Sequence, residues 1–96
     1  MPRRRYLITY DIADDKRRTK LFKTLQGEGD HAQYSVFFCE CDEAELAALR
    51  ATITEIIHHD DDQVLILDLG PGANLLEASL EIIGKHYKPP TRVLVV

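Results

Sequence analysis

The 96-residue sequence contains no tryptophan, one methionine and two cysteines, and it has no apolar run of membrane-spanning length. The cysteines, Cys39 and Cys41, form a lone C-x-C, whereas structural zinc sites need a second pair of ligands. We expect both to be ordinary reduced strand residues, which fits the cytosol. The N-terminal segment is basic but becomes polar too soon for a signal peptide. We therefore expect a cytoplasmic protein with no membrane partner.

Two kinds of catalytic site also lack support in the sequence. No glycine-rich phosphate loop is present, and Ser35 has no histidine and aspartate beside it for nucleophilic catalysis. The run from His58 to Asp62 holds metal-binding residue types. A solvated helix end is the better explanation of this run, because histidine near a helix C-terminus interacts favourably with the helix dipole.

The chain is long enough for one domain, residues 1–96, and its 45% hydrophobic and 29% charged residues are typical of a globular fold. Its pattern predicts strand, helix, two strands, helix and strand in that order, which is an α+β, ferredoxin-like βαββαβ sandwich. The expected elements are a strand over 6–12, a helix from Asp14 to about Gln26, a short strand ending near Gln33, a strand from Ser35 to Cys41, a helix after the capping box of Asp42 and Glu45, and a strand over 63–69.

The sequence pattern predicts the secondary structure of the C-terminal region less clearly. Residues 70–74, GPGAN, have turn chemistry. Residues 75–83 fit either a short helix or a loop that leads into a strand. The final TRVLVV predicts an extra extended segment, and we expect the tail over about 84–96 to dock on a partner.

The predicted strands are apolar on both faces, as Leu7 against Ile8 and Phe37 against Phe38 illustrate. Two helices cover only one face of a four-stranded sheet, so the other face needs a separate cover. A second copy of the sheet, related by a two-fold axis, is the simplest cover. The pattern therefore predicts a homodimer.

The net charge of −4 argues against a generic nucleic-acid-binding protein, but the charges are unevenly distributed. Residues 1–23 hold eight basic and three acidic residues, a net of +5, while residues 24–96 carry a net of −9. The basic segment is a candidate footprint for phosphates, although a solvated basic helix explains the charge asymmetry about as well.

Asp11 ends the first predicted strand directly before the basic helix. One carboxylate holds a divalent ion poorly, but a two-fold dimer would place two copies of Asp11 around one ion. Arg18 falls on the inward face of the helix, from which it could reach back to the strand end and contact phosphate. The alternatives are that Asp11 is a turn acid and that Arg18 pairs with an acid.

Four stretches together resemble a known family. They are YLITYDI, DDKRR, QYSVFFCE and DQVLILDL. At this spacing they resemble the second core CRISPR adaptation protein, also called the CRISPR-associated small endoribonuclease. The similarity extends over nearly the whole chain. One departure is His31, which stands where many members carry a basic residue; a free imidazole is mostly uncharged at neutral pH.

The resemblance implies a ferredoxin-like homodimer that binds Mg²⁺, or another divalent cation, between two copies of Asp11. It also implies a role in spacer acquisition beside the CRISPR integrase subunit. By position, Tyr10, Asp11 and Arg18 match catalytic residues of the family. The positions that the resemblance and the basic segment together assign to binding of RNA or double-stranded DNA are Arg17, Arg18, Lys20, Lys23, Ser35 and Phe37.

Two functions remain open from the sequence. The first is a Mg²⁺-dependent endonuclease that acts on RNA or DNA phosphodiesters with paired Asp11. The second is a non-catalytic dimer that binds DNA through its basic face and bridges dimers of the integrase. Asp11 supports the first function, while the basic residues and the TRVLVV segment support the second.

Overall fold

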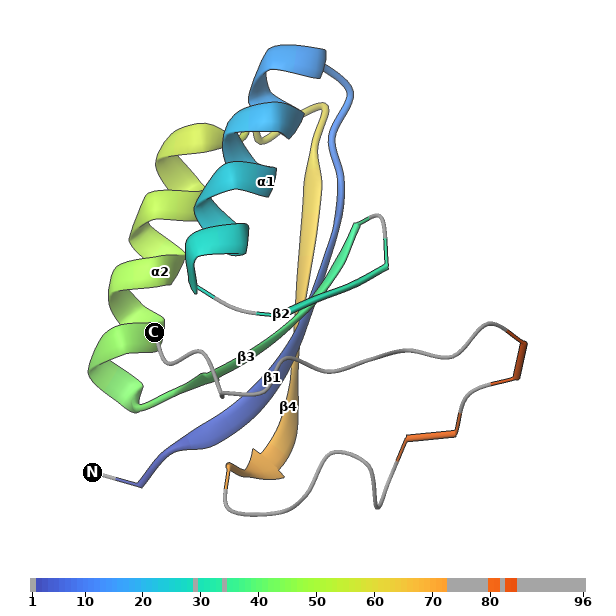
Figure 1. The fold of residues 1–96 in the computed structure, drawn as a ribbon. Coiled ribbons are helices and arrows are strands. Elements are labelled where there is room, and N and C mark those ends of the chain that lie inside the picture. The colour runs from blue at the N-terminus through green and yellow to red at the C-terminus, as the bar shows by residue number, and fades with distance from the viewer. Residues whose placement is uncertain (1, 29, 34, 73–79, 82, 85–96) are drawn as a thin grey trace.

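The computed structural model describes residues 2–28, 30–33, 35–72, 80–81 and 83–84, and it confirms the βαββαβ order (Figure 1). The predicted elements all recur within these residues, with boundaries that differ by a few positions. In chain order they are β1 (Arg4–Asp11), α1 (Asp15–Glu28), β2 (Asp30–Gln33), β3 (Val36–Cys41), α2 (Glu43–Ile56) and β4 (Gln63–Pro71).

The four strands form one antiparallel sheet in the order β2-β3-β1-β4. Strand β1 is therefore central and pairs with both β3 and β4. Both helices lie against the same side of this sheet (Figure 1). This order and layering are those of the ferredoxin-like fold that the element pattern predicts.

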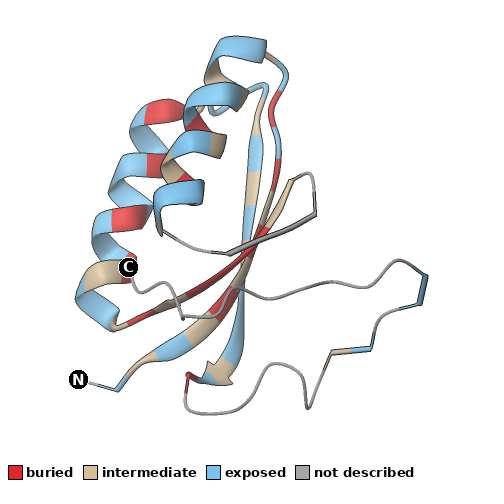
Figure 2. Cartoon of the chain, in the orientation of Figure 1, coloured by how far each residue is buried: buried red, intermediate tan, exposed pale blue. Residues whose placement is uncertain are grey.

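The core lies between the sheet and the two helices, where the red positions gather in Figure 2. Strand β1 supplies alternate residues to it, because successive strand side chains point to opposite faces. Helix α2 supplies an apolar stripe at helical spacing. The main cluster of buried residues is Ile8, Tyr10, Ile12, Leu21, Leu25, Phe37, Cys39, Leu49, Ile53 and Ile56. Cys39 and Cys41 are both buried, as expected of ordinary strand residues.

Both helix starts follow from local capping chemistry. The Asp14 side chain accepts a hydrogen bond from the Arg17 backbone N–H at 2.9 Å, which caps α1. The predicted capping box of α2 is confirmed, since Asp42 and Glu45 exchange side-chain to backbone bonds of 2.8 and 3.0 Å. Helix α1 continues through Gly27 to Glu28, slightly past the expected end.

Strand β4 also runs further than expected, into the segment that the sequence assigned to a turn. It ends at Pro71, and its register against β1 shifts between Arg5 and Tyr6. Gly70 adopts a φ of 100°, which an L side chain rarely adopts. The irregularity therefore lets the strand absorb the turn-type residues Gly70 and Pro71. The predicted extra C-terminal segment lies almost entirely outside the described residues.

One face of the sheet has no described helix over it, and we call it the open face. Cross-strand partners share a face, so the register places Leu7, Phe38 and Leu67 together on it, next to Thr9 and Leu65. The side chains of Leu65 and Leu67 are 53% and 56% exposed. Such an exposed apolar surface is the feature from which the sequence predicts a homodimer.

No helix among the described residues has the length and apolar character needed to cross a membrane.

Candidate active site

Asp11 is the last residue of β1 and lies on the open face of the sheet. Its neighbours Tyr10 and Ile12 are buried, whereas Asp11 itself is exposed. Its backbone pairs with Gln63 of β4. Among the described residues, none forms a hydrogen bond or ion pair with the Asp11 carboxylate. The strand end therefore presents an accessible carboxylate that has no cation partner within the described part of the chain.

The nearby aspartates behave differently, because each already has a donor. Asp14 accepts the helix-capping N–H of Arg17, and this bond lowers the pKa of the Asp14 carboxyl. Asp15 forms an ion pair with Arg18. Asp62 forms one with Arg17 at 2.7 Å. These acids contribute to the structure of the strand end, whereas Asp11 remains available to a ligand.

Arg18 reaches the strand end, as its predicted inward position requires. Its Nη1 donates to the carbonyl oxygen of Ile12 at 2.9 Å, and its Nη2 pairs with Asp15. Both interpretations of Arg18 therefore hold in part: the side chain returns to the strand end, and it is also paired with an acid. Its role as a catalytic or nucleic-acid contact stays a prediction.

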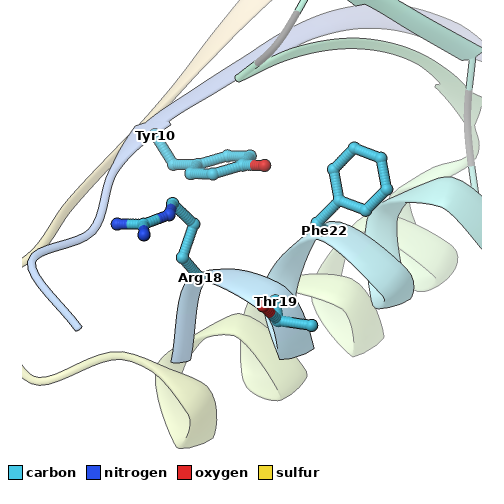
Figure 3. A pocket seen from close by; sticks show the side chains of 4 residues that line it. All are labelled: Tyr10, Arg18, Thr19 and Phe22. Carbon is cyan, nitrogen blue, oxygen red and sulfur yellow. The ribbon is translucent and has the colours of Figure 1, made fainter. Parts of the chain in front are cut away.

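Tyr10 and Asp11 are adjacent in sequence but lie on opposite faces of the sheet. The Tyr10 side chain is 7% exposed and stacks on Phe37 with ring centroids 6.4 Å apart. It borders a cavity of about 170 Å³ that Arg18, Thr19 and Phe22 also line (Figure 3). The structure therefore does not bring the Tyr10 ring and the Asp11 carboxylate together in one protomer.

Phe37 lies in the core, and its role as a nucleic-acid contact stays a prediction. The sequence placed it among the nucleic-acid contacts, but its side chain is 0% exposed and packs against Tyr10 and Phe22. Both faces of β3 are apolar, so its pattern did not show which phenylalanine faces the helices. Ser35 is half-buried, and its carbonyl accepts the Tyr10 N–H at 3.2 Å, extending the pairing of β1 with β3.

We expect Phe37→Ala to act on stability. Removing a fully buried phenylalanine should lower the free energy of unfolding by about 3–5 kcal/mol, because it loses apolar burial and leaves a cavity. Urea denaturation followed by circular dichroism measures this loss. Phe37→Leu should lower the free energy of unfolding by less, because leucine keeps most of the buried apolar side chain. A Phe37→Ala protein as stable as the wild type but defective in nucleic-acid binding would instead support Phe37 as a nucleic-acid contact.

Much of the basic N-terminal charge is neutralised by acids from elsewhere in the chain. Arg3 pairs with Glu45 at 2.7 Å, and Arg4 pairs with Asp68 at 2.9 Å. Arg17 pairs with Asp62. The uneven charge of the sequence is thus partly balanced in three dimensions by these three ion pairs.

Three lysines of α1 keep an outward position. Lys16, Lys20 and Lys23 follow the helical spacing of four and three residues, and all are exposed. No ion pair joins them to another described residue. We call them the lysine stripe. It lies on the outer side of the helix layer, whereas Asp11 lies on the far side of the sheet.

Asp62 is the residue that the sequence did not single out. It stood in an acidic loop that we expected to be solvated, yet its side chain is 0% exposed. It directly precedes Gln63, the pairing partner of Asp11. Only the antiparallel register of β1 and β4 brings Asp62 beside the strand end. In the same loop His58 Nδ1 lies 3.3 Å from an Asp61 carboxylate oxygen, and the described residues contain no group of three or more metal-ligating side chains.

Comparison with known proteins finds one family across most of the chain. The family model described as CRISPR associated protein Cas2 matches residues 4–74. A relative from Geobacter sulfurreducens, named CRISPR-associated endoribonuclease Cas2, is 42% identical over 91 residues, covering 95% of both chains. A relative of the same type from Rhodospirillum rubrum is 36% identical over 91 residues, covering 95% of this chain and 88% of the relative.

Solved structures show the same architecture. A crystal structure of a hypothetical protein from Thermus thermophilus has a TM-score of 0.75 and 34% identity, covering 92% of this chain and 99% of that one. Streptococcus pyogenes Cas2, crystallised at pH 6.5, has a TM-score of 0.72 and 28% identity, covering 83% of this chain and 99% of that one.

Proposed function

Since this chain belongs to the CRISPR-associated Cas2 family, we propose that it is a Mg²⁺-dependent endonuclease that cleaves RNA or DNA phosphodiesters during spacer acquisition. The observation that carries this proposal is the Asp11 carboxylate, which is exposed at the end of β1 and has no partner among the described residues. Relatives named as endoribonucleases support the reaction class. Substituting Asp11 by asparagine and measuring metal-dependent cleavage tests this function.

The residues of one protomer fit a magnesium ion only in part. Mg²⁺ binds through one or two carboxylates, with waters and phosphate oxygens completing its octahedron. In a single protomer we assign the ion to Asp11, and the described residues hold no group of three or more ligating side chains. Two copies of Asp11 meet the requirement. When bound there, the ion would neutralise phosphate charge and activate water for attack.

The open face supports the homodimer that this arrangement requires. Asp11 shares that face with Leu7, Leu65 and Leu67, whose apolar side chains a second copy of the sheet would cover. Packing two open faces about a two-fold axis brings the two Asp11 carboxylates to the same interface. Their mutual repulsion favours a divalent cation between them.

In this arrangement the chain contributes binding and positioning. Asp11 would hold the ion near the phosphodiester. Arg18, which already contacts the strand end, lies close enough in sequence and space to be a candidate phosphate contact. The Tyr10 ring is separated from Asp11 by the sheet, so we assign it a packing role within its own protomer.

The lysine stripe favours a second candidate function, a non-catalytic dimer that bridges copies of the CRISPR integrase. Lys16, Lys20 and Lys23 lie on the layer opposite Asp11, so a nucleic-acid backbone could bind them without reaching a metal. The predicted docking segment, residues 92–96, lies outside the described residues and stays a prediction.

Charge reversal at the lysine stripe should weaken nucleic-acid binding to all sequences alike. Each phosphate interaction that Lys20→Glu/Lys23→Glu removes should lower the slope of log affinity against log salt by about 1, because counterion release drives the binding. Fluorescence anisotropy between about 50 and 200 mM salt measures this slope. Arg50→Glu on α2, also exposed, is the control and should change the slope less. Equal effects would mean that the stripe is not the binding surface.

A further inference from the structure

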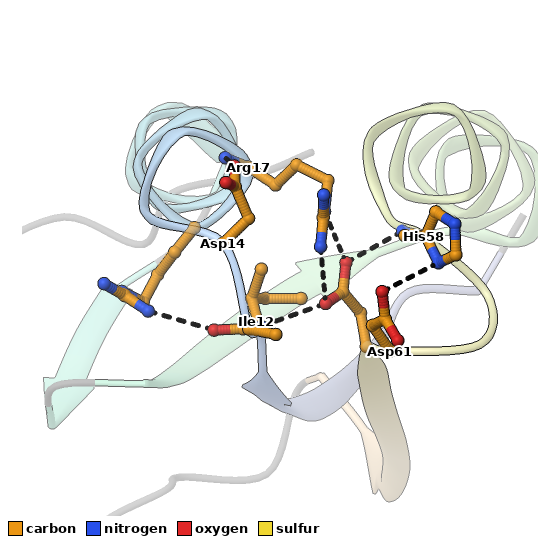
Figure 4. A network of polar contacts seen from close by, with 8 residues as sticks. Ile12, Asp14, Arg17, His58 and Asp61 are labelled. Atoms are coloured by element: carbon orange, nitrogen blue, oxygen red, sulfur yellow. Dashed lines mark hydrogen bonds and ion pairs between the residues drawn. The ribbon is translucent and has the colours of Figure 1, made fainter.

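The peptide group between Ile12 and Ala13, the second after the Asp11 Cα, is held at both of its polar atoms. The carbonyl oxygen of Ile12 accepts a hydrogen bond from Arg18 Nη1 at 2.9 Å. The N–H of Ala13, on the same peptide, donates to Asp62 Oδ1 at 3.0 Å. Figure 4 shows these two bonds approaching the peptide from its two sides. The orientation of this peptide plane is therefore set by side chains from α1 and from the loop before β4.

The Asp62 carboxylate is itself held by three groups. Arg17 donates to it through Nε at 2.7 Å and through Nη2 at 3.2 Å. The backbone N–H of His58 donates at 2.8 Å, in addition to Ala13. These donors, the Arg17 guanidinium first, hold the pKa of Asp62 well below its usual range. One shielded carboxylate thus joins the end of β1, the first turn of α1 and the end of α2.

The backbone of Asp11 has limited support from the sheet. Pairing of β1 with β3 has its last partners at Thr9 and Val36, while pairing with β4 continues to Asp11 and Gln63. On the β3 side the bond from Tyr10 to Ser35 is the last that the described residues show. The direction in which the chain leaves Asp11 therefore depends on the peptide that Asp62 and Arg18 hold.

We propose that Asp62 is a positioning residue, which together with Arg17 and Arg18 fixes the peptide between Ile12 and Ala13 and thereby holds the Asp11 carboxylate in place. This inference rests on the proposed function, in which Asp11 binds the metal. A ligating carboxylate needs to stay within about 0.5 Å of its productive position, and residues behind it supply that constraint. Substituting such supporting residues typically costs about 10–100-fold in metal affinity or activity.

The two arginines at the start of α1 act on opposite sides of the peptide between Ile12 and Ala13. Arg17 acts on the N–H side of the peptide through Asp62, and Arg18 acts directly on its C=O side. A lysine at position 17 would keep the positive charge but lose the forked contact with Asp62. A phosphate contact would need only the positive charge of Arg17, whereas the positioning role needs its forked hydrogen bonds to Asp62. Arg17→Lys therefore distinguishes the two roles.

The chain contains a matched control for Asp62. Asp68, also on the β4 side of the molecule, forms an ion pair with an arginine of the N-terminal half, Arg4, at 2.9 Å. It also accepts a backbone N–H, from Gly70 at 2.8 Å. Asp68 lies opposite Tyr6, toward the other end of β1. Asp68→Asn therefore removes an arginine–aspartate ion pair that is more exposed than that of Asp62, and it leaves the strand end at Asp11 untouched.

The experiment compares wild type, Asp62→Asn and Asp68→Asn by backbone NMR relaxation and amide hydrogen exchange of the full-length protein. In Asp62→Asn, the order parameters at Asp11 and Ala13 should fall from about 0.85 toward about 0.6, and Ala13 exchange should accelerate. The concentration of Mn²⁺ that half-broadens the Asp11 amide, and the Mg²⁺ concentration for half-maximal cleavage, should rise by about 10–100-fold. Asp68→Asn should match wild type in all of these measurements.

Each outcome decides the proposal. Unchanged order parameters at Asp11 in a folded Asp62→Asn protein overturn the positioning role, whatever happens to cleavage. Lower order parameters at Asp11, with the half-broadening Mn²⁺ concentration and the half-maximal Mg²⁺ concentration unchanged, overturn the link between Asp62 and the metal site. If wild type shows no Mn²⁺ effect at Asp11, the proposed function fails, while the order parameters still decide the positioning. Should Asp62→Asn not fold, Arg17→Lys is measured in its place, with the same direction and a smaller change expected.

Discussion

Asp11→Asn should abolish metal-dependent cleavage while leaving the dimer and nucleic-acid binding intact. The substitution keeps the shape of the side chain but removes its charge, and in a homodimer both copies change together. We expect cleavage to fall by at least about 100-fold, the scale of losing one group that stabilises transition-state charge. Binding should persist or strengthen, because a negative charge facing the phosphates is removed. Cleavage of labelled RNA and DNA across a Mg²⁺ titration measures the effect.

Asp60→Asn is the matched control for this measurement. Asp60 is an exposed aspartate in the loop between α2 and β4, and it forms no ion pair with another described residue. This variant should cleave at the wild-type rate. Full activity in a highly purified Asp11→Asn preparation would contradict the metal assignment, since the remaining described residues offer no cluster of ligands to replace it.

The same variant separates the catalytic function from the bridging one. If the protein acts as a non-catalytic bridge, Asp11→Asn should still support spacer acquisition with the integrase. Deleting residues 92–96 should then abolish acquisition, because the deletion removes the predicted docking strand. Loss of acquisition in Asp11→Asn, with the dimer and its integrase complex intact, would contradict the bridging function.

Leu67→Glu should convert the protein from a dimer to a monomer. Leu67 is 56% exposed on the open face, and its cross-strand partner Leu7 lies on the same face of the central strand. A dimer formed through this face would bury two unpaired carboxylates per assembly, and burying an unpaired charge is far more costly than removing a leucine from an interface. Sedimentation at micromolar concentration should show the wild type at twice the 11.0 kDa chain mass and the variant at that mass.

Ala51→Glu is the control for the dimer experiment. It introduces the same charge at an exposed position of α2, on the other side of the molecule. This variant should remain dimeric and cleave normally, whereas Leu67→Glu should lose metal-dependent cleavage together with the dimer. A dimeric Leu67→Glu protein would show that the open face is not the interface, and the shared metal site would then lose its basis.

The local pattern of the sequence was sufficient for the order and type of the elements. The capping box of Asp42 and Glu45 appears as predicted because capping depends on residues three positions apart. Strand and helix periodicities likewise depend on neighbours along the chain. The boundaries of α1 and β4 were less well predicted, since tertiary packing carried both elements past glycines that locally favour an end.

The sequence by itself also singled out Asp11, because an acid at the end of an apolar run stands out without knowledge of the fold. It could not tell that Phe37, rather than Phe38, is the member of the apolar pair that faces the helices, since β3 is apolar on both faces and only the tertiary packing distinguishes them. The ion pairs of Arg3, Arg4 and Arg17 with acids more than 40 positions away depend on how the helices, strands and loops pack together. Only the tertiary structure placed Asp62 beside the end of β1: its hydrogen bond with the Ala13 N–H joins two residues 49 positions apart that lie outside the strands, and such a contact leaves no periodic signal in the chain.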